Sequence, residues 1–170
     1  MTGIRCYTDG SCSGGRGPMG AGVVIEYGVK DVIEYGGYLG EGTNNIAELT
    51  AVGTAMWFLR ARIQYETAHE IVVFTDSEYC IGVLTNPAWQ PQSNLKLIED
   101  VKALLVPNVV FHHVRGHVGY RGNERADKLA HHARKERMTH EHVFTRNHFV
   151  DPRGISHDPL EPLAGPDFSS

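Results

Sequence analysis

The chain has 170 residues, 41% of them hydrophobic and 21% charged, which is the composition of one ordinary globular domain. It carries 16 Lys and Arg against 20 Asp and Glu, and the formal net charge of -4 at first counts against a nucleic-acid-binding protein. The three cysteines have no CxxC spacing, and no apolar run is long enough for a signal peptide or a membrane span. These features exclude disulfide-rich, secreted and membrane-spanning classes, and we expect a cytoplasmic protein.

The amino-terminal part of the sequence predicts an antiparallel meander. Residues 4–9 have the composition of a short strand that ends at Gly10, and a glycine-rich loop is expected over residues 11–20. Two further β-rich runs cover residues 22–27 and 32–39. Strands that follow one another this closely favour antiparallel pairing.

Helical periodicity begins after the third of these runs. Apolar residues recur at helical spacing over about residues 44–63, with Thr43 or Asn44 as the N-cap. A nearly continuous apolar run at residues 70–76 predicts a strand covered on both faces, and Ser77 opens a short helix.

The order of the remaining elements completes an α/β pattern. Two prolines predict a loop at residues 85–93, and a helix over 94–105 and a strand over 109–114 follow. Asn123 is the expected N-cap of a final helix. The resulting order, βββαβααβα, predicts a mixed sheet with helices packed against it.

Charge and proline content divide the chain near its end. Residues 112–137 hold seven basic and three acidic side chains, whereas residues 138–170 hold two basic and five acidic ones. Four of the eight prolines also fall in this last segment. We therefore expect a folded domain over 1–137 and a Pro-containing acidic C-terminal extension over 138–170, partly ordered or disordered.

Four acidic residues lie at the ends of predicted elements. Asp9 and Asp76 each follow an apolar strand and precede a turn, a position that faces ligand crevices in α/β sheets but that also simply favours turns. Glu48 and Asp127 lie early in predicted helices, where the helix dipole alone accounts for an acid. Brought together, four carboxylates would require cations, and hard oxygen ligands suit Mg²⁺.

Four separated motifs resemble those of type 1 ribonuclease H, in order and in spacing, over about residues 2–134. They are Thr8-Asp-Gly-Ser11, Thr43-Asn-Asn-Ile-Ala-Glu-Leu49, Thr75-Asp-Ser77 and Val114-Arg-Gly-His-Val-Gly-Tyr-Arg-Gly-Asn-Glu-Arg-Ala-Asp-Lys-Leu-Ala130. The resemblance implies a ribonuclease H-like fold whose five-stranded mixed sheet has three antiparallel strands and two parallel additions. It also implies a metal-dependent endonuclease that hydrolyses the RNA strand of RNA–DNA hybrids and leaves 5′-phosphate and 3′-hydroxyl ends.

The same resemblance assigns the catalytic residues. Asp9, Glu48, Asp76 and Asp127 match the carboxylates that bind two Mg²⁺ ions, with Mn²⁺ as a substitute, in a two-metal-ion mechanism. His117 matches the histidine of the loop before the last helix, which assists proton transfer or product release. We expect a monomer that acts on an RNA–DNA hybrid and needs no small-molecule cofactor.

Substrate contacts are implied at two further motifs. Asn44 and Asn45 match the pair of amides that reach the minor groove of the hybrid, and Thr43 matches a contact to a DNA phosphate. Glu48 lies where the family also senses the ribose 2′-hydroxyl. Ser11 and Cys12 match positions close to the backbone of the hybrid.

The sequence departs from the family pattern at three places. Arg16 lies in the glycine-rich loop that usually carries an asparagine, and Glu78 stands where a glutamine is common. Between residues 85 and 105 the chain lacks the Lys-rich protrusion that grips the DNA strand in some relatives, although Trp89 remains there to stack or pack near the substrate. We therefore expect a weaker grip on the hybrid.

Two alternative functions stay open. One is a noncatalytic hybrid- or RNA-binding module on the same fold, which would not need four acidic residues beside phosphates. The other is an integrase- or resolvase-like DNA nuclease, which the Asn44–Asn45 pair and the His117 loop disfavour.

Overall fold

The computed structural model describes residues 3–115 and 120–144, the last two of them by their backbone alone. No helix within this part of the chain is long and apolar enough to cross a membrane. The helices and strands, in chain order, are β1 (Ile4–Cys12), β2 (Gly17–Glu26), β3 (Val32–Gly42), α1 (Asn44–Arg62), the short 3-10 helix η1 (Tyr65–Thr67), β4 (Ile71–Thr75), α2 (Glu78–Thr85), α3 (Leu95–Leu104), β5 (Val109–His113), α4 (Arg121–Glu136) and β6 (His140–Phe144).

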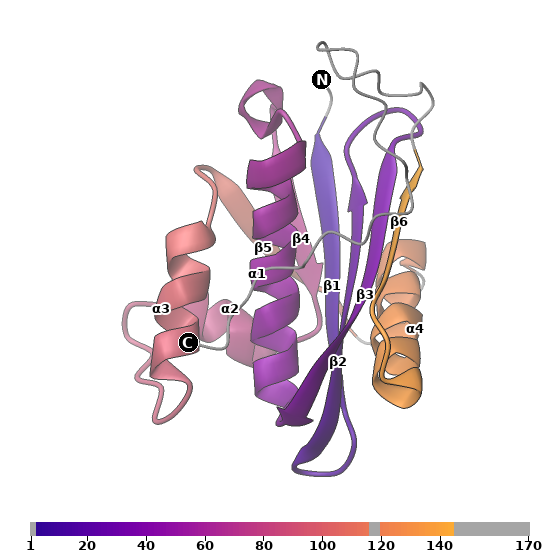
Figure 1. Ribbon diagram of the computed structural model, residues 1–170. Helices are drawn as coiled ribbons and strands as arrows, with labels where there is room; N and C mark the ends of the chain where they lie inside the picture. Colours follow the sequence, from indigo (N-terminus) through magenta and orange to yellow (C-terminus); the bar gives the residue numbers. More distant parts are fainter. Residues whose placement is uncertain (1–2, 116–119, 145–170) are drawn as a thin grey trace.

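The strands form one mixed sheet in the order β5-β4-β1-β2-β3-β6 (Figure 1). Strands β1, β2 and β3 form the predicted antiparallel meander, and β4 and β5 add to β1 in parallel. The predicted α/β class and mixed sheet are therefore confirmed. The sheet described here has six strands, one more than expected, because β6 pairs antiparallel with β3.

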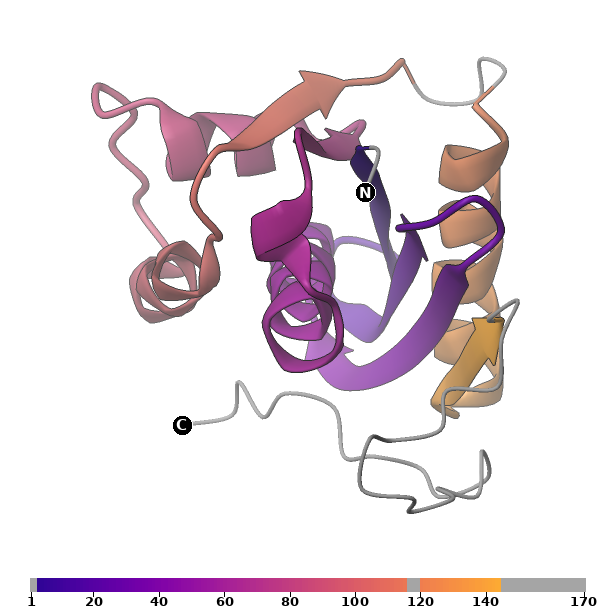
Figure 2. The ribbon, with the colours of Figure 1, turned by 90° about the horizontal axis from the view of Figure 1, so that it is seen from above.

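Helices cover the two faces of the sheet unequally. Helix α1, with α3 against it, lies on one face, and α4 lies on the other, as Figures 1 and 2 show. The main core fills the α1 side, where Phe58 and Leu59 pack against strand residues such as Ile25. Burying these side chains stabilises the fold through the apolar area removed from water.

Glycines on β2 allow α4 to lie unusually close to the sheet. A Cβ atom added at Gly20 or Gly22 would collide with the backbone oxygens of Ala130 and Ala126 in α4. Because neither strand nor helix places a bulky side chain between them, the backbone of α4 approaches the sheet directly. This approach brings the Asp127 region of α4 close to the neighbouring strand β1.

Strands β1 and β4 diverge after a short parallel pairing. Their register ends at the pair Tyr7 and Phe74, whereas β1 continues to Cys12 paired with β2 alone. Along β1, Cys6 packs into the core beneath α1 and Tyr7 packs with Ala126 of α4. Because side chains alternate between the two faces, residues 9 and 11 share the α4 side with Tyr7. The divergence opens the sheet to side chains from both helical layers.

The predicted end of the first strand was wrong. Strand β1 runs past Gly10 to Cys12, and the expected loop over 11–20 contracts to residues 13–16. The glycine is needed for close approach and not for a turn, because a Cβ atom at Gly10 would collide with the backbone of Ala47 and Glu48 in α1. Asp9 accordingly lies inside β1 and not at its end.

Two smaller expectations also failed. Strand β4 is not covered on both faces: Val72 and Phe74 stay half-buried, since α4 packs on β1, β2 and β3. Asn123 is not an N-cap, because α4 begins at Arg121 and Tyr120 occupies the cap position. Asn123 is instead buried inside the first turn of α4.

Strand β6 comes from the segment that the sequence predicts to be an extension. Its Glu141 forms a half-buried ion pair with Arg62 at the end of α1. The Arg62 guanidinium also lies 5.4 Å from the centre of the Phe58 ring, a cation–π contact. The division of the chain at residue 137 stays a prediction, and residues 145–170 lie outside the described part.

We predict that β6 stabilises the domain. A chain that ends at residue 137 loses the strand and leaves the half-buried Arg62 without its carboxylate, so we expect the free energy of unfolding to fall by about 2–4 kcal/mol. Urea denaturation of this chain measures the loss. A chain that ends at residue 144 keeps β6 and is the control; equal stability of the two chains would contradict the prediction.

Candidate active site

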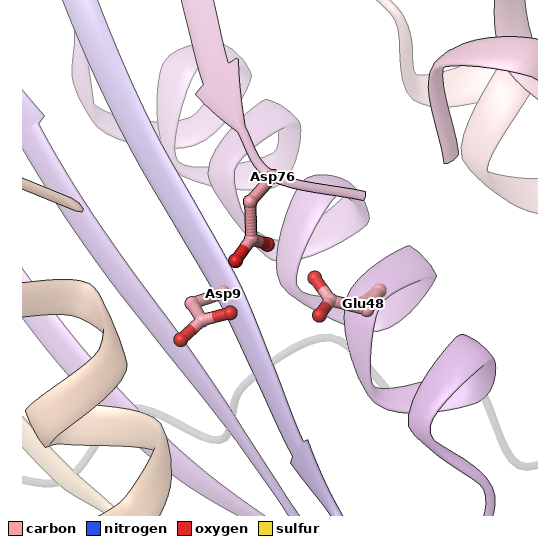
Figure 3. Close-up of side chains that lie close together, drawn as sticks. All are labelled: Asp9, Glu48 and Asp76. Carbon is pink, nitrogen blue, oxygen red and sulfur yellow. The ribbon is translucent and has the colours of Figure 1, made fainter. Parts of the chain in front are cut away.

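Three carboxylates meet where β1 and β4 diverge. Asp9, Glu48 and Asp76 each place a carboxylate oxygen within 4.8 Å of the other two. Figure 3 shows the three side chains pointing toward one another from β1, α1 and the residue that follows β4. Residues that are far apart in sequence therefore form one acidic cluster, as the sequence predicted for these three.

The start of α1 holds Glu48 in place. Thr43 is the N-cap, and its hydroxyl accepts a hydrogen bond from the Ile46 amide at 3.4 Å. One turn before Glu48, Asn44 donates its side-chain amide to Glu48 Oε1 at 3.3 Å. The Glu48 side chain is only 4% exposed, so this amide orients a carboxylate that has little contact with solvent.

Asp76 and the residues around it form a tight turn after β4. The Ser77 amide donates to Thr75 Oγ1 at 3.1 Å, and the Ser77 hydroxyl caps α2 by accepting from the Cys80 amide. His113 of β5 contacts the Asp76 carbonyl oxygen through Nε2 at 3.2 Å. These contacts fix the backbone from which the Asp76 carboxylate projects.

Burial and repulsion together suppress ionisation of the cluster. Burial first, and then the nearby Asp76 and Asp127, raise the pKa of Asp9 to about 8, although a hydrogen bond from the Gly10 amide lowers it. Burial likewise holds the pKa of Glu48 well above its usual range, and Asp9 and Asp76 add to this shift. Without a cation, the cluster cannot carry its full negative charge at neutral pH.

The donor set fits a divalent cation. Glu48 Oε2 is buried and has no hydrogen-bond partner, so one oxygen of the cluster is left for a ligand. No Lys or Arg in the described part of the chain forms an ion pair with Asp9, Glu48 or Asp76. Several hard carboxylate oxygens without a basic partner are the donors that Mg²⁺ and Mn²⁺ prefer.

Asp127 approaches the cluster from the opposite helical layer. It lies half-buried in α4, within hydrogen-bonding reach of Asp9, and contributes to the raised pKa of that carboxyl. It is not one of the three residues whose oxygens lie mutually within 4.8 Å. The structure therefore places Asp127 beside Asp9, at the edge of the cluster. His117 lies outside the described residues, so its position stays a prediction.

Five predicted substrate residues lie on or next to β1 and α1, the elements that carry Asp9 and Glu48. Ser11 and Cys12 are half-buried at the end of β1, and Asn44 and Asn45 are exposed in the first turn of α1 beside the cap residue Thr43. The Asn44 amide is partly engaged by Glu48, a contact that its i, i+4 spacing permits and that the sequence analysis missed.

The other three predicted substrate residues lie on separate loops and helices. Arg16 is exposed in the turn between β1 and β2, and Glu78 is exposed in the first turn of α2. Trp89 lies after α2 with 43% of its surface exposed, and its ring packs closely over Gly82. No contact described here joins these three residues to the carboxylates.

One side chain near the site carried no signal in the sequence. Arg134 of α4 donates through Nε to the Ser11 hydroxyl at 2.9 Å, across 123 positions of sequence. The family motif that contains Asp127 ends at Ala130, before Arg134. An arginine near the carboxyl end of a helix is also common, because its positive charge interacts favourably with the helix dipole. Only the packing of α4 against β1 identifies it.

The fold and the acidic cluster define an α/β protein with a carboxylate site for divalent cations, the arrangement that metal-dependent phosphodiesterases use. Comparison with known proteins then gives the family. The sequence model of RNase H matches residues 1–135, and the chain belongs to the RNase H family.

Curated relatives and solved structures agree with this assignment. The chain is 41% identical over 143 residues to the ribonuclease H of Thermosynechococcus vestitus, covering 76% of this chain and 88% of that protein. It is 37% identical over 139 residues to the ribonuclease H of a Cyanothece strain, covering 74% and 85%. Its fold matches LC11-RNase H1, solved in complex with an RNA/DNA hybrid, with a TM-score of 0.66 and 32% identity, over 79% of this chain and 98% of that one.

A second solved structure is similar to the same extent. RNase H1 from the halophilic archaeon Halobacterium salinarum matches with a TM-score of 0.66 and 27% identity, over 79% of this chain and 98% of that one. The predicted resemblance and the ribonuclease H class of enzyme are confirmed.

The raised pKa values predict how stability depends on pH. The unfolded chain loses the Asp9 proton near pH 4, whereas the folded protein without metal keeps it up to about pH 8. Between these values the folded state binds more protons, so stability falls as pH rises through this range. We expect thermal melts in EDTA to show this fall and Mg²⁺ to reverse it at pH 8.

Asp76→Asn should stabilise the metal-free protein. The change removes a charge that raises the pKa values of both Asp9 and Glu48. We expect the Tm at pH 8 in EDTA to rise by roughly 3–6 °C, about 1–2 kcal/mol, and its pH dependence to flatten. A lower Tm than the wild type under these conditions would contradict the electrostatic account.

Proposed function

We propose that the chain is an endonuclease that hydrolyses the RNA strand of RNA–DNA hybrids by a two-metal-ion mechanism and leaves 5′-phosphate and 3′-hydroxyl ends. The observation that carries the proposal is the cluster of Asp9, Glu48 and Asp76, with its suppressed ionisation and the unpartnered Glu48 Oε2. The relatives named ribonuclease H, one of them solved with an RNA/DNA hybrid, support the choice of substrate.

Each carboxylate has a role in this proposal. Asp9, Glu48 and Asp76 hold the cations, and Asp127 completes the set from α4. Bound there, Mg²⁺ or Mn²⁺ would supply an activated water and charge stabilisation for the departing 3′ oxygen. Asn44 keeps the Glu48 carboxylate oriented, and the buried position of Asp9 limits competing contacts with solvent.

The first turn of α1 is well placed to contact the minor groove. Asn45 is exposed and free to contact base edges or a ribose, and Asn44 keeps one amide hydrogen and its carbonyl oxygen beyond the bond to Glu48. Thr43, next to them, is proposed to meet a phosphate of the DNA strand. Glu48 then lies close enough to this turn to sense the ribose 2′-hydroxyl.

The remaining residues of the proposed interface are supported by the resemblance and by their exposed surface, without a described contact to the carboxylates. Arg16 and Trp89 present exposed surface from two loops, and Glu78 does so from the start of α2. Ser11 and Cys12 complete the backbone contact at the end of β1. The proton-transfer or product-release role of His117, the monomeric state and the cytoplasmic location remain proposals of the same kind.

A noncatalytic binding module on this fold explains the site less well. Such a module gains nothing from three carboxylates that meet without a basic partner, because they repel the phosphates of its ligand. A catalytic site instead uses them to hold cations. The carboxylate cluster therefore favours the enzyme over the binding module.

Cleavage should depend on the metal and on Asp76. We expect end-labelled RNA–DNA hybrid to be cut with Mg²⁺ or Mn²⁺ and not in EDTA, and kcat of Asp76→Asn to fall by about 10³-fold or more because a ligand carboxylate is lost. Glu99→Gln removes an exposed acid on α3 and is the matched control. Activity in EDTA, or full activity of Asp76→Asn, would refute the mechanism.

Hybrid binding should depend only weakly on salt. Residues 85–105 offer just Lys96 and Lys102 as basic groups, and Lys96 is paired with Asp100 at 2.7 Å. We expect a shallower slope of log affinity against log salt concentration than in relatives with a Lys-rich protrusion, measured by fluorescence anisotropy in EDTA. A slope equal to theirs would show that other residues supply the missing contacts.

A further inference from the structure

A second polar group lies where α4 packs against the end of β1. Ser11 projects from β1 on the same face as Asp9, two residues further along the strand. There its hydroxyl accepts a hydrogen bond from Arg134 Nε at 2.9 Å. Arg134 Nη2 in turn lies 3.0 Å from His131 Nδ1. The three residues form what we term the Ser11–His131–Arg134 group.

In the described part of the chain, the Arg134 guanidinium is held by two hydrogen bonds and is not paired with an acid. Arg62 is paired with Glu141, and Arg125 is paired with Glu34 through two hydrogen bonds. Among the residues that the structure describes, Arg134 forms no ion pair and bonds only to a neutral hydroxyl and an imidazole. Its charge is positioned but not compensated, as a site for an anion requires.

The imidazole adds a second donor to the group. A guanidinium carries only donors, so His131 Nδ1 accepts the hydrogen bond from Arg134, and the ring proton then resides on Nε2. His131 is exposed, and Arg134 is half-buried. The free guanidinium donors and the imidazole N–H together match the several oxygens of a phosphate diester.

The spacing relates this group to the cleavage site. Two residues of a β-strand span about 6–7 Å, so Ser11 lies that far beyond Asp9 along β1. On α4, Arg134 follows Asp127 by two turns, about 10 Å. Since each nucleotide advances about 3.4 Å along the axis of a duplex, this range corresponds to about two to three nucleotides.

We propose that the Ser11–His131–Arg134 group is a phosphate-binding subsite for the RNA strand, which holds a backbone phosphate about two to three nucleotides from the bond that is cleaved. The assignment rests on the proposed function, since it takes the carboxylate cluster as the place of cleavage. Arg134 supplies the charge, Ser11 fixes its orientation, and His131 donates from Nε2. The subsite supplies a positively charged contact to the hybrid, which the α2–α3 region provides poorly because it has few basic residues.

Binding in EDTA tests the charge of the subsite without any chemistry. Arg134→Gln should weaken hybrid binding several-fold and reduce the magnitude of the salt slope by about one, the value for one lost phosphate contact. Lys135→Gln removes the same charge from the next residue, which is exposed, and is the matched control with a nearly unchanged slope. Equal effects of the two changes would mean that Arg134 acts only through the general positive charge of α4, and would refute the proposed subsite.

A substituted hybrid tests the position. In each hybrid, one linkage of the RNA strand is replaced by an uncharged deoxynucleotide methylphosphonate. A series of hybrids moves this linkage step by step away from the cleavage site. The reference hybrid carries a charged deoxynucleotide linkage at the same position. The wild type should lose affinity most at a linkage about two to three nucleotides away, and Arg134→Gln should lose nothing further there. Equal losses in both proteins at that linkage would refute the assignment.

Further variants separate binding from folding and from the proposed activity. Ser11→Ala leaves the charge of Arg134 in place but removes its anchor, so it should keep the salt slope and lose the dependence on linkage position. This variant tests the subsite even if Arg134→Gln proves unstable in a thermal melt. If the wild type cleaves the hybrid in Mg²⁺ and neither variant changes binding, the subsite alone is refuted. If the wild type does not cleave the hybrid, the proposed function is refuted.

Discussion

The burial and mutual repulsion of a carboxylate cluster are the constraint on which this structure depends. Asp9 and Glu48 are almost fully buried and lie beside Asp76, and their pKa values are raised because burial removes solvent and no basic residue in the described part of the chain balances their charge. Such a cluster destabilises a fold unless another interaction offsets it. The protein keeps it at the place where the central strands separate, and we propose that a divalent cation supplies the missing positive charge.

The rest of the fold brings the two helical layers to this point. Gly10 lets the first turns of α1 touch β1, and Gly20 and Gly22 let α4 approach from the other face. Glu48 and Asp127 therefore reach the same gap from opposite sides of the sheet. The net charge of -4 overstates the negative field that a substrate meets, because the basic segment 112–137 opposes it and the proposed cations would oppose it as well.

Sequence patterns predicted what depends on local periodicity and motif spacing. The antiparallel meander, the long helix α1 and the four acidic residues were all anticipated, since each leaves a local signal. The role of Gly10, the addition of β6 to the sheet and the contact between Arg134 and Ser11 were not. Each of these three features depends on which distant segments pack together. In the sequence alone, a glycine suggests a turn, an acidic segment suggests a tail, and an arginine near a helix end suggests an interaction with the helix dipole.

Proton release on metal binding tests the central claim most directly. If the cluster retains protons at neutral pH because its carboxylates are buried and repel one another, then Mg²⁺ must displace them when it binds. Isothermal titration calorimetry at pH 7, repeated in buffers of different ionisation enthalpy, measures the number of protons released. The account predicts at least one proton per protein for the wild type and markedly fewer for Asp76→Asn. Mg²⁺ binding with no proton release by the wild type would contradict it.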